Sequence, residues 1–215
     1  MSDLNQTIID TSTWISRTTK LDTLPQLVLS SSSPARHALL KRLQIPFVTV
    51  APHVDETPLP GESIKAMVLR LAEEKAKKPA HLYSHAHIIG CDQVGLIDDT
   101  LLCKPITYEN ALNQLRVMSG KKVTFYTAIC LWSTQTQHCQ LAIETYDVHI
   151  RPLTDAMMAT YLQKEEVLQC AGSIHVEGLG MALIEKLVGD DYTTLIGLPL
   201  IRLTKMLENV GFEVV

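Results

Sequence analysis

Apolar positions along the chain follow two spacings, and together they predict an alternation of strands and helices. Short apolar runs bounded by polar residues are typical of buried strands, whereas apolar residues at every third or fourth position are typical of helices with one buried face. In the first half of the chain, these patterns predict strands at 27–29, 47–50 and 88–92 and helices at 34–43 and 63–77. Ser33 is suited to cap the first helix, because Pro34 then occupies the first helical position, where its missing N–H costs nothing.

The pattern in the second half of the chain predicts two hairpins, three more helices and a further strand. Asp98 and Asp99 predict a hairpin turn before the apolar pair at 101–102. Strands are predicted at 122–133, 140–151 and 173–181, and helices at 109–118 (ending at Gly120), 154–163 and 199–210. Parallel strand–helix–strand units combined with an antiparallel hairpin indicate the α/β class, with a mixed, twisted sheet and flanking helices.

The first 26 residues differ in composition from the rest of the chain. They are rich in Ser, Thr and Asp, and they match neither a secretory signal nor a transit peptide. We therefore expect 1–26 to be a loosely ordered N-terminal extension. An arm that packs on the partner subunit of a homodimer is the alternative. No repeat or linker interrupts 27–215, which we expect to form one continuous domain with two lobes.

Composition and charge exclude several classes of protein. The 215 residues carry a net charge of −4 and only 5% aromatic residues, which argues against a nucleic-acid polymer as partner. No apolar stretch is long enough to cross a bilayer, so no membrane partner is expected. The five cysteines are scattered and never spaced as C-x-x-C, which favours a reducing cytoplasm and cysteines packed as small apolar residues.

Four consecutive serines precede the first predicted helix and form a candidate anion site. Backbone N–H groups at a helix N-terminus attract anions, so Ser31, Ser33 and Arg36 are candidates for holding a phosphate group. A serine before a proline is also the ordinary cap of a helix that binds nothing. On these residues alone, the ordinary cap is the more common explanation.

Two acids are candidates for catalysis and metal binding. Asp92 ends the apolar run at 88–92, and a parallel strand delivers its last residue to the crevice at the carboxyl edge of the sheet. Glu56 lies in a proline-rich loop and, together with Asp92, could supply the carboxylate oxygens that Mg²⁺ takes besides substrate phosphates. The alternatives are a capping role for Asp92 and a solvated loop acid at Glu56.

Two lysines and a further acid complete the candidates. Lys104 precedes Pro105, which holds its backbone extended, so Lys104 can present a fixed ammonium to a phosphate. Lys75 lies in the helix predicted at 63–77 and is either a second phosphate ligand or an exposed helix lysine. Glu177 adjoins Gly178, a setting that permits close approach of a ligand or marks a bulge.

Other chemistries find no support in the sequence. His81, His85 and His87 are expected to form a surface cluster rather than a metal site, because no acid motif adjoins them. The sequence contains neither the G-x-x-x-x-G-K-[ST] phosphate loop nor the G-x-S-x-G hydrolase elbow.

Several of these residues belong to short motifs that, in their order and spacing, resemble the Maf family of nucleoside triphosphate pyrophosphatases over about 26–212. The motifs are Ser31–Arg36, Val54–Thr57, Leu71–Ala76, Ile89–Val94, Lys104–Pro105, Ala171–Gly178 and Gly197–Leu200. The resemblance implies a fold related to the inosine triphosphate pyrophosphatases, with a cleft between two lobes. It also implies attack of water at the α-phosphorus, which releases pyrophosphate and a nucleoside monophosphate.

The resemblance also assigns expected roles to the candidate residues. Asp92 matches the catalytic aspartate, and Glu56 matches a ligand of the metal or water, so a divalent cation (Mg²⁺ or Mn²⁺) is expected. Arg36, Lys75 and Lys104 match basic positions that neutralise the triphosphate.

Three positions are expected to set the preference for the base. Gln93 and Glu177 resemble the branch that acts on 7-methyl-GTP, whereas the dTTP/UTP branch carries Thr and Gln at these places. A buried acid at Glu177 would suit the positive charge of N7-methylguanine. Ala35 departs from the large Trp or Arg of the family. The alternatives are a dTTP/UTP pyrophosphatase and a non-catalytic nucleotide-binding regulator of cell division.

Overall fold

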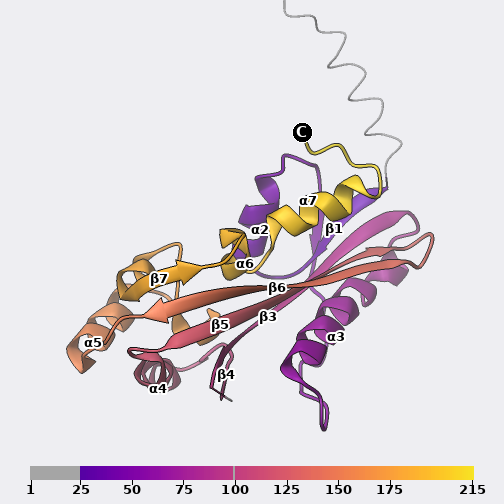
Figure 1. Cartoon of the computed structure of the whole chain (residues 1–215). Coiled ribbons are helices and arrows are strands. Elements are labelled where there is room, and N and C mark those ends of the chain that lie inside the picture. The colour runs from indigo at the N-terminus through magenta and orange to yellow at the C-terminus, as the bar shows by residue number, and fades with distance from the viewer. Residues whose placement is uncertain (1–24, 99) are drawn as a thin grey trace, which may run out of the picture.

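The computed structural model describes residues 25–98 and 100–215, and its centre is a seven-stranded mixed sheet in the order β2-β1-β3-β5-β6-β7, with β4 paired to β3 (Figure 1). The strands are β1 (Gln26–Ser30), β2 (Val48–Val50), β3 (Ala86–Ile97), β4 (Thr100–Leu102), β5 (Lys122–Ser133), β6 (Cys139–Ile150) and β7 (Ile184–Val188). This architecture confirms the predicted mixed sheet. Residues 1–24 of the predicted extension lie outside the described residues, and Gln26 already begins β1.

The sheet changes from parallel to antiparallel pairing at β3. Strand β1 runs parallel to β2 and β3, whereas β3, β5, β6 and β7 pair antiparallel in succession. The last β1–β3 pair joins Ser30 and Gly90, and β3 continues beyond it to Ile97. The prediction that Asp92 ends its strand is therefore wrong. Asp92 lies in the middle of β3, just beyond the carboxyl end of its neighbour β1.

Helices cover both faces of the sheet, as predicted. They are α2 (Pro34–Lys41), α3 (Ile64–Lys77), α4 (Tyr108–Met118), α5 (Asp155–Lys164), α6 (Tyr192–Ile196) and α7 (Leu200–Glu208). Four of them begin at a hydroxyl cap, because the side chains of Ser33, Ser63, Thr107 and Thr154 accept a hydrogen bond from a backbone N–H in the first turn. The cap at Ser33 was predicted. Helix α6 was not predicted. No helix among the described residues is long and apolar enough to cross a membrane.

The two largest of four hydrophobic clusters among the described residues lie along the long strands and correspond to the two predicted lobes. One core joins α2 and α7 to β1 and neighbouring parts of β3 and β5. The other joins α4 and α5 to β4 and the opposite ends of β5 and β6. In Figure 1, α2 and α7 lie on one face of the sheet, and α3 lies on the other. The strands β3 and β5 thus connect the lobes, and side chains in their middle lie between the two cores.

Helix α3 packs directly on β3 at Gly90. A Cβ atom built there would lie 2.1 Å from the carbonyl oxygen of Ala72 and 2.4 Å from the backbone nitrogen of Ala76. No other residue type fits this contact without displacing the helix. Gly90 therefore sets how closely α3 approaches the strand.

The prediction of a strand at 173–181 is wrong. The chain there forms the 3₁₀ turns η2 (Ala171–Ser173) and η3 (Leu179–Leu183), and the strand β7 begins only at Ile184. Ile174 and Val176 are buried, so the apolar alternation that imitates a strand reflects loop side chains packed into the core. Positive φ angles at Gly172 (67°) and Ser173 (57°) break the extended backbone.

Two expectations for polar side chains are also corrected. His87 lies on β3 and is buried, so the three histidines do not form a surface cluster. Cys103 is exposed at the end of β4, and Cys139 and Cys170 are half-buried, so the cysteines do not all pack in the core. Strand β3 is central and covered on both faces, so it buries a histidine that the local sequence leaves undecided.

Candidate active site

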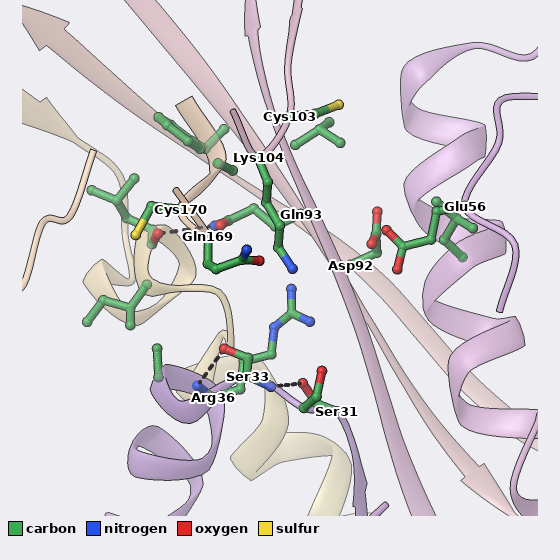
Figure 2. Close-up of a pocket in the computed structure, with 18 of the residues that line it drawn as sticks. Ser31, Ser33, Arg36, Glu56, Asp92, Gln93, Cys103, Lys104, Gln169 and Cys170 are labelled. Atoms are coloured by element: carbon green, nitrogen blue, oxygen red, sulfur yellow. Dashed lines mark hydrogen bonds between the residues drawn. The ribbon is translucent and has the colours of Figure 1, made fainter. Parts of the chain in front are cut away.

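A cavity of about 540 Å³ lies between the two lobes, and every candidate residue of the sequence lines it. These residues are Ser31, Ser33, Ala35, Arg36, Glu56, Lys75, Asp92, Gln93, Lys104 and Glu177. They come from segments far apart in the sequence: the β1–α2 loop and the first turn of α2, the β2–α3 loop, α3, the middle of β3, the segment after β4 and the η2–η3 turn. Figure 2 shows the acidic pair Glu56 and Asp92 on one side of this cavity and Arg36 and Lys104 in its middle.

A buried ion pair forms the acidic side of the cavity. Nζ of Lys75 lies 2.6 Å from Oδ1 of Asp92 and 2.7 Å from Oε1 of Glu56. Lys75 and Asp92 are each only 5% exposed, whereas the Glu56 side chain is 60% exposed. Lys75 is therefore not an exposed helix lysine, since its buried ammonium pairs with two carboxylates and offsets one of their two negative charges.

The contact at Gly90 explains how this pair forms. Side chains of a strand alternate between its faces, so Gly90 and Asp92 face the same side of β3, toward α3. Because α3 touches the backbone at Gly90 through Ala72 and Ala76, Lys75 is carried to within hydrogen-bond distance of Asp92.

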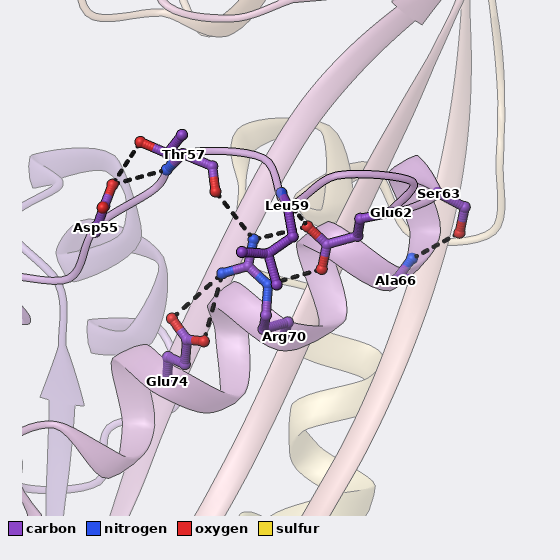
Figure 3. A network of polar contacts seen from close by, with 8 residues as sticks. All are labelled: Asp55, Thr57, Leu59, Glu62, Ser63, Ala66, Arg70 and Glu74. Carbon is purple, nitrogen blue, oxygen red and sulfur yellow. Dashed lines mark hydrogen bonds and ion pairs between the residues drawn. The ribbon is translucent and has the colours of Figure 1, made fainter.

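A polar network holds the loop that carries Glu56 against α3 (Figure 3). Arg70 donates two hydrogen bonds of 2.7 Å to the carboxylate of Glu62 and one of 3.3 Å to the carbonyl oxygen of Thr57. Hydrogen bonds from Thr57 to Asp55 tighten the same loop and hold the pKa of Asp55 below its usual range. Glu56 is thus placed by neighbours on both sides to face Lys75.

The basic side of the cavity differs from the expectation for Arg36. Its Nε donates to the carbonyl oxygen of Gly197 at 2.9 Å, and its Nη1 donates to that of Cys91 at 2.8 Å. Two donors that could have bound phosphate therefore fix the guanidinium to the protein. The rest of the group points toward the Lys104 ammonium, which enters from the opposite side in Figure 2.

The serine loop has the geometry of a helix cap. Oγ of Ser33 accepts from the backbone nitrogen of Arg36 at 3.4 Å, and Oγ of Ser31 accepts from that of Ser33 at 3.1 Å. The loop lines the cavity at the N-terminus of α2, where the helix dipole favours an anion. The sequence left a cap and an anion site as alternatives, and this geometry is compatible with both.

The amide of Gln93 is held in one orientation. Its Nε2 lies within hydrogen-bond distance of three oxygens: the carbonyls of Thr194 (2.8 Å) and Leu195 (3.1 Å) and Oγ1 of Thr127 (3.0 Å). The Thr127 hydroxyl donates to the Thr194 carbonyl, so it accepts from Gln93. Because these partners use the amide nitrogen, Gln93 offers its Oε1 as a hydrogen-bond acceptor to a ligand.

Glu177 lies at the rim of the cavity and is not the buried acid that was expected. It occupies the turn between η2 and η3, and its side chain is 31% exposed. Its Oε1 lies 3.6 Å from Nη2 of Arg42, itself 53% exposed. A ligand at this carboxylate therefore competes with a solvated arginine.

Other residues of the site were missed by the sequence. Gln169 lines the cavity, and Figure 2 shows its amide pointing to the interior near Lys104. Thr127, Thr194 and Arg42 contact predicted residues from distant segments. No local pattern marks them, because each acts through a contact that exists only in the folded chain.

The two carboxylates fit a divalent cation. Oxygens of Glu56 and Asp92 converge on one ammonium, which shows that both can reach a common positive charge. Oxygen ligands suit Mg²⁺ and Mn²⁺. Among the described residues, no group of three His, Cys, Asp or Glu side chains could hold a metal alone. Further ligands would have to come from a bound substrate or from water.

The chain belongs to the Maf-like protein family, whose model matches residues 26–210. A 7-methyl-GTP pyrophosphatase of Methylobacillus flagellatus is 48% identical over 192 residues, covering 89% of this chain and 100% of that protein. A 7-methyl-GTP pyrophosphatase of Nitrosococcus oceani is 50% identical over 190 residues, covering 88% of this chain and 96% of that protein. A dITP/XTP pyrophosphatase structure from Mycobacterium abscessus shares 17% identity with a TM-score of 0.37, covering 60% of this chain and 75% of that one.

Proposed function

We propose that this chain is a nucleoside triphosphate pyrophosphatase that hydrolyses 7-methyl-GTP to 7-methyl-GMP and pyrophosphate. The observation that carries the proposal is the buried Asp92–Lys75 pair in the wall of a cavity that also holds Arg36 and Lys104. An acid held beside fixed cations is the arrangement that water attack on a phosphoanhydride requires. The relatives named 7-methyl-GTP pyrophosphatase support the choice of substrate.

In this proposal, the basic residues bind and orient the triphosphate. Lys104 and the free edge of the Arg36 guanidinium contact the phosphates, and the N-terminus of α2 with Ser31 and Ser33 binds a further phosphate oxygen. Fixed cations of this kind explain how a chain with a net charge of −4 holds a highly anionic substrate.

Asp92 accepts the proton of the attacking water at its carboxylate. Lys75 holds that carboxylate in place through the 2.6 Å contact and offsets its burial. Glu56 and Asp92 would hold the divalent cation, Mg²⁺ or Mn²⁺, which supplies positive charge against the phosphates and makes a nearby water easier to deprotonate. Attack at the α-phosphorus then expels pyrophosphate.

Recognition of the base rests on Gln93, Glu177 and Ala35. The Oε1 of Gln93 is an acceptor for the N–H groups of a guanine edge, and the Glu177 carboxylate meets the positive charge of the N7-methylated ring. Ala35 leaves the wall of the pocket open, which favours a bulky purine. The dTTP/UTP pyrophosphatase and the non-catalytic regulator are the alternatives that the assays below distinguish.

Isotope labelling tests the reaction itself. Hydrolysis of 7-methyl-GTP in H₂¹⁸O should place one ¹⁸O atom in 7-methyl-GMP and none in pyrophosphate, because water attacks the α-phosphorus. The Asp92→Asn variant should lose this reaction, and Asp155→Asn, on the surface of α5, is the matched control. Label in the pyrophosphate, or release of orthophosphate as the primary product, would contradict the proposal. The cytoplasmic location and the homodimer stay predictions.

A further inference from the structure

A pair of thiols lies across the β5–β6 hairpin, away from the cavity. Sγ of Cys130 and Sγ of Cys139 are 2.7 Å apart, and both cysteines are free. In the strand register, Cys130 pairs with Leu141 and Cys139 pairs with Trp132, so the two cysteines are diagonal neighbours on one face. An S–S bond is about 2.05 Å long, so only a small movement separates these sulfurs from bonding distance.

The surroundings of the pair favour a reactive thiolate at Cys139. The hydrogen bond between the two thiols holds the pKa of Cys139 below its usual range, and the nearby Lys77 ammonium acts in the same direction. Lys77 lies over the ring of Trp132, 4.6 Å from its centroid, while Glu73 pairs with Lys77 and opposes its effect. Cys139 is half-buried, so a small reagent reaches it more easily than the buried Cys130.

Cys91 provides the contrast. Its thiol is completely buried and donates to the carbonyl oxygens of Ala128 and Gly197, and burial raises its pKa to about 11. Such a cysteine is inert at neutral pH. The hairpin pair therefore differs from Cys91 in both geometry and electrostatics.

We propose that Cys130 and Cys139 form an oxidisable dithiol that reacts with low-molecular-weight disulfides to give an intramolecular disulfide. The Cys139 thiolate attacks one sulfur of the reagent and expels one thiolate, which leaves a mixed disulfide. Cys130 then attacks the Cys139 sulfur and expels the second thiolate. The protons of the two cysteines end on the two released thiolates, which become thiols, so the chain is oxidised by two electrons and the reagent is reduced by two.

The reaction is tested on the full chain with glutathione disulfide, followed by maleimide quenching and peptide mass mapping. We expect a cross-linked peptide that joins Cys130 to Cys139, loss of the two thiols at these positions, release of two glutathione molecules for each cross-link and reversal by dithiothreitol. Glutathione retained on Cys130 or Cys139 of the wild-type chain, a disulfide from either of them to another chain, or two thiols that stay free would overturn the proposal.

Single variants assign the two roles. Cys130→Ser should trap glutathione on Cys139, because the second thiol is missing, whereas Cys139→Ser should abolish the reaction. Cys103→Ser removes an exposed cysteine outside the pair and should leave the cross-link unchanged. If Cys103→Ser instead prevented the cross-link, or if Cys130→Ser trapped no glutathione, the assignment would be wrong. Peptide mapping of the wild-type chain tests the disulfide even if one of the variants fails to fold. The outcome is independent of the nucleotide assays.

Discussion

The ammonium of Lys75 lies 2.6 Å from Oδ1 of Asp92, and both side chains are buried between α3 and β3. The two residues are only 17 positions apart in the sequence, but one lies on a helix and the other on the central strand. The pair gives the cavity its acid, and the contact that creates it depends on the absence of a side chain at Gly90.

Replacement of Asp92 tests the proposed base. Asp92→Asn keeps the shape of the side chain but cannot accept the proton, so we expect kcat to fall by about 10²–10⁴ with the fold retained. Steady-state kinetics and circular dichroism measure the two effects. A folded variant with near-normal turnover would leave Asp92 with a structural role only.

Replacement of Lys75 tests the buried ion pair. Lys75→Met leaves Asp92 buried without its partner, and we expect a loss of about 3 kcal/mol or more in the free energy of unfolding. Lys78→Met, at the exposed end of the same helix, should change it by about 0.5 kcal/mol or less. Urea denaturation compares the variants, and equal effects would mean that the contact contributes no stability.

Gly90→Ala should displace helix α3. The added Cβ would meet backbone atoms of Ala72 at 2.1 Å, and backbone cannot move aside as a flexible side chain can. We expect a loss of about 1–3 kcal/mol in unfolding free energy together with reduced activity, since α3 carries Lys75. Gly95→Ala is the control, because its Cβ would meet Leu102 at 3.2 Å and require a smaller adjustment. A larger effect at Gly95 would contradict this account of the packing.

Chelation tests the divalent cation. EDTA should abolish pyrophosphate release, and Mg²⁺ or Mn²⁺ should restore it. Glu56→Gln, which removes one of the two converging carboxylates, should raise the metal concentration needed for half-maximal activity. Glu109→Gln, an exposed acid in the first turn of α4, should leave that concentration unchanged. Full activity after chelation and dialysis would remove the metal from the mechanism.

Local signals in the sequence predicted much of the fold. The cap at Ser33 and the apolar spacing behind it placed α2 nearly correctly, and the helices predicted at 63–77 and 154–163 agree with α3 and α5 to within one residue. The apolar alternation at 173–181 led to the incorrect prediction of a strand, because buried loop side chains produce the same pattern as a strand.

For the candidate site too, the sequence predicted part of the arrangement and missed the rest. Residue types in short motifs pointed to Asp92, Lys75 and Lys104, but their contacts depend on distant segments. Arg36 is fixed by the carbonyl of Gly197, and Gln93 is fixed by that of Thr194, both far along the chain. Contacts between residues so far apart produce no periodic pattern in the sequence, so the orientations of the Arg36 and Gln93 side chains could not be predicted.

A side-by-side assay of nucleotides tests the central claim most directly. Pyrophosphate release is measured for 7-methyl-GTP, GTP, dTTP and UTP with the wild-type chain, with Glu177→Gln and with the control Glu185→Gln, an exposed acid on β7. We predict that 7-methyl-GTP has the highest kcat/KM, by about 10- to 150-fold, since a charge-assisted contact contributes about 1.5–3 kcal/mol. Glu177→Gln should remove most of this preference while kcat for GTP changes little, and Glu185→Gln should preserve it. The account is contradicted if dTTP or UTP is the best substrate, or if Glu177→Gln leaves the ranking unchanged.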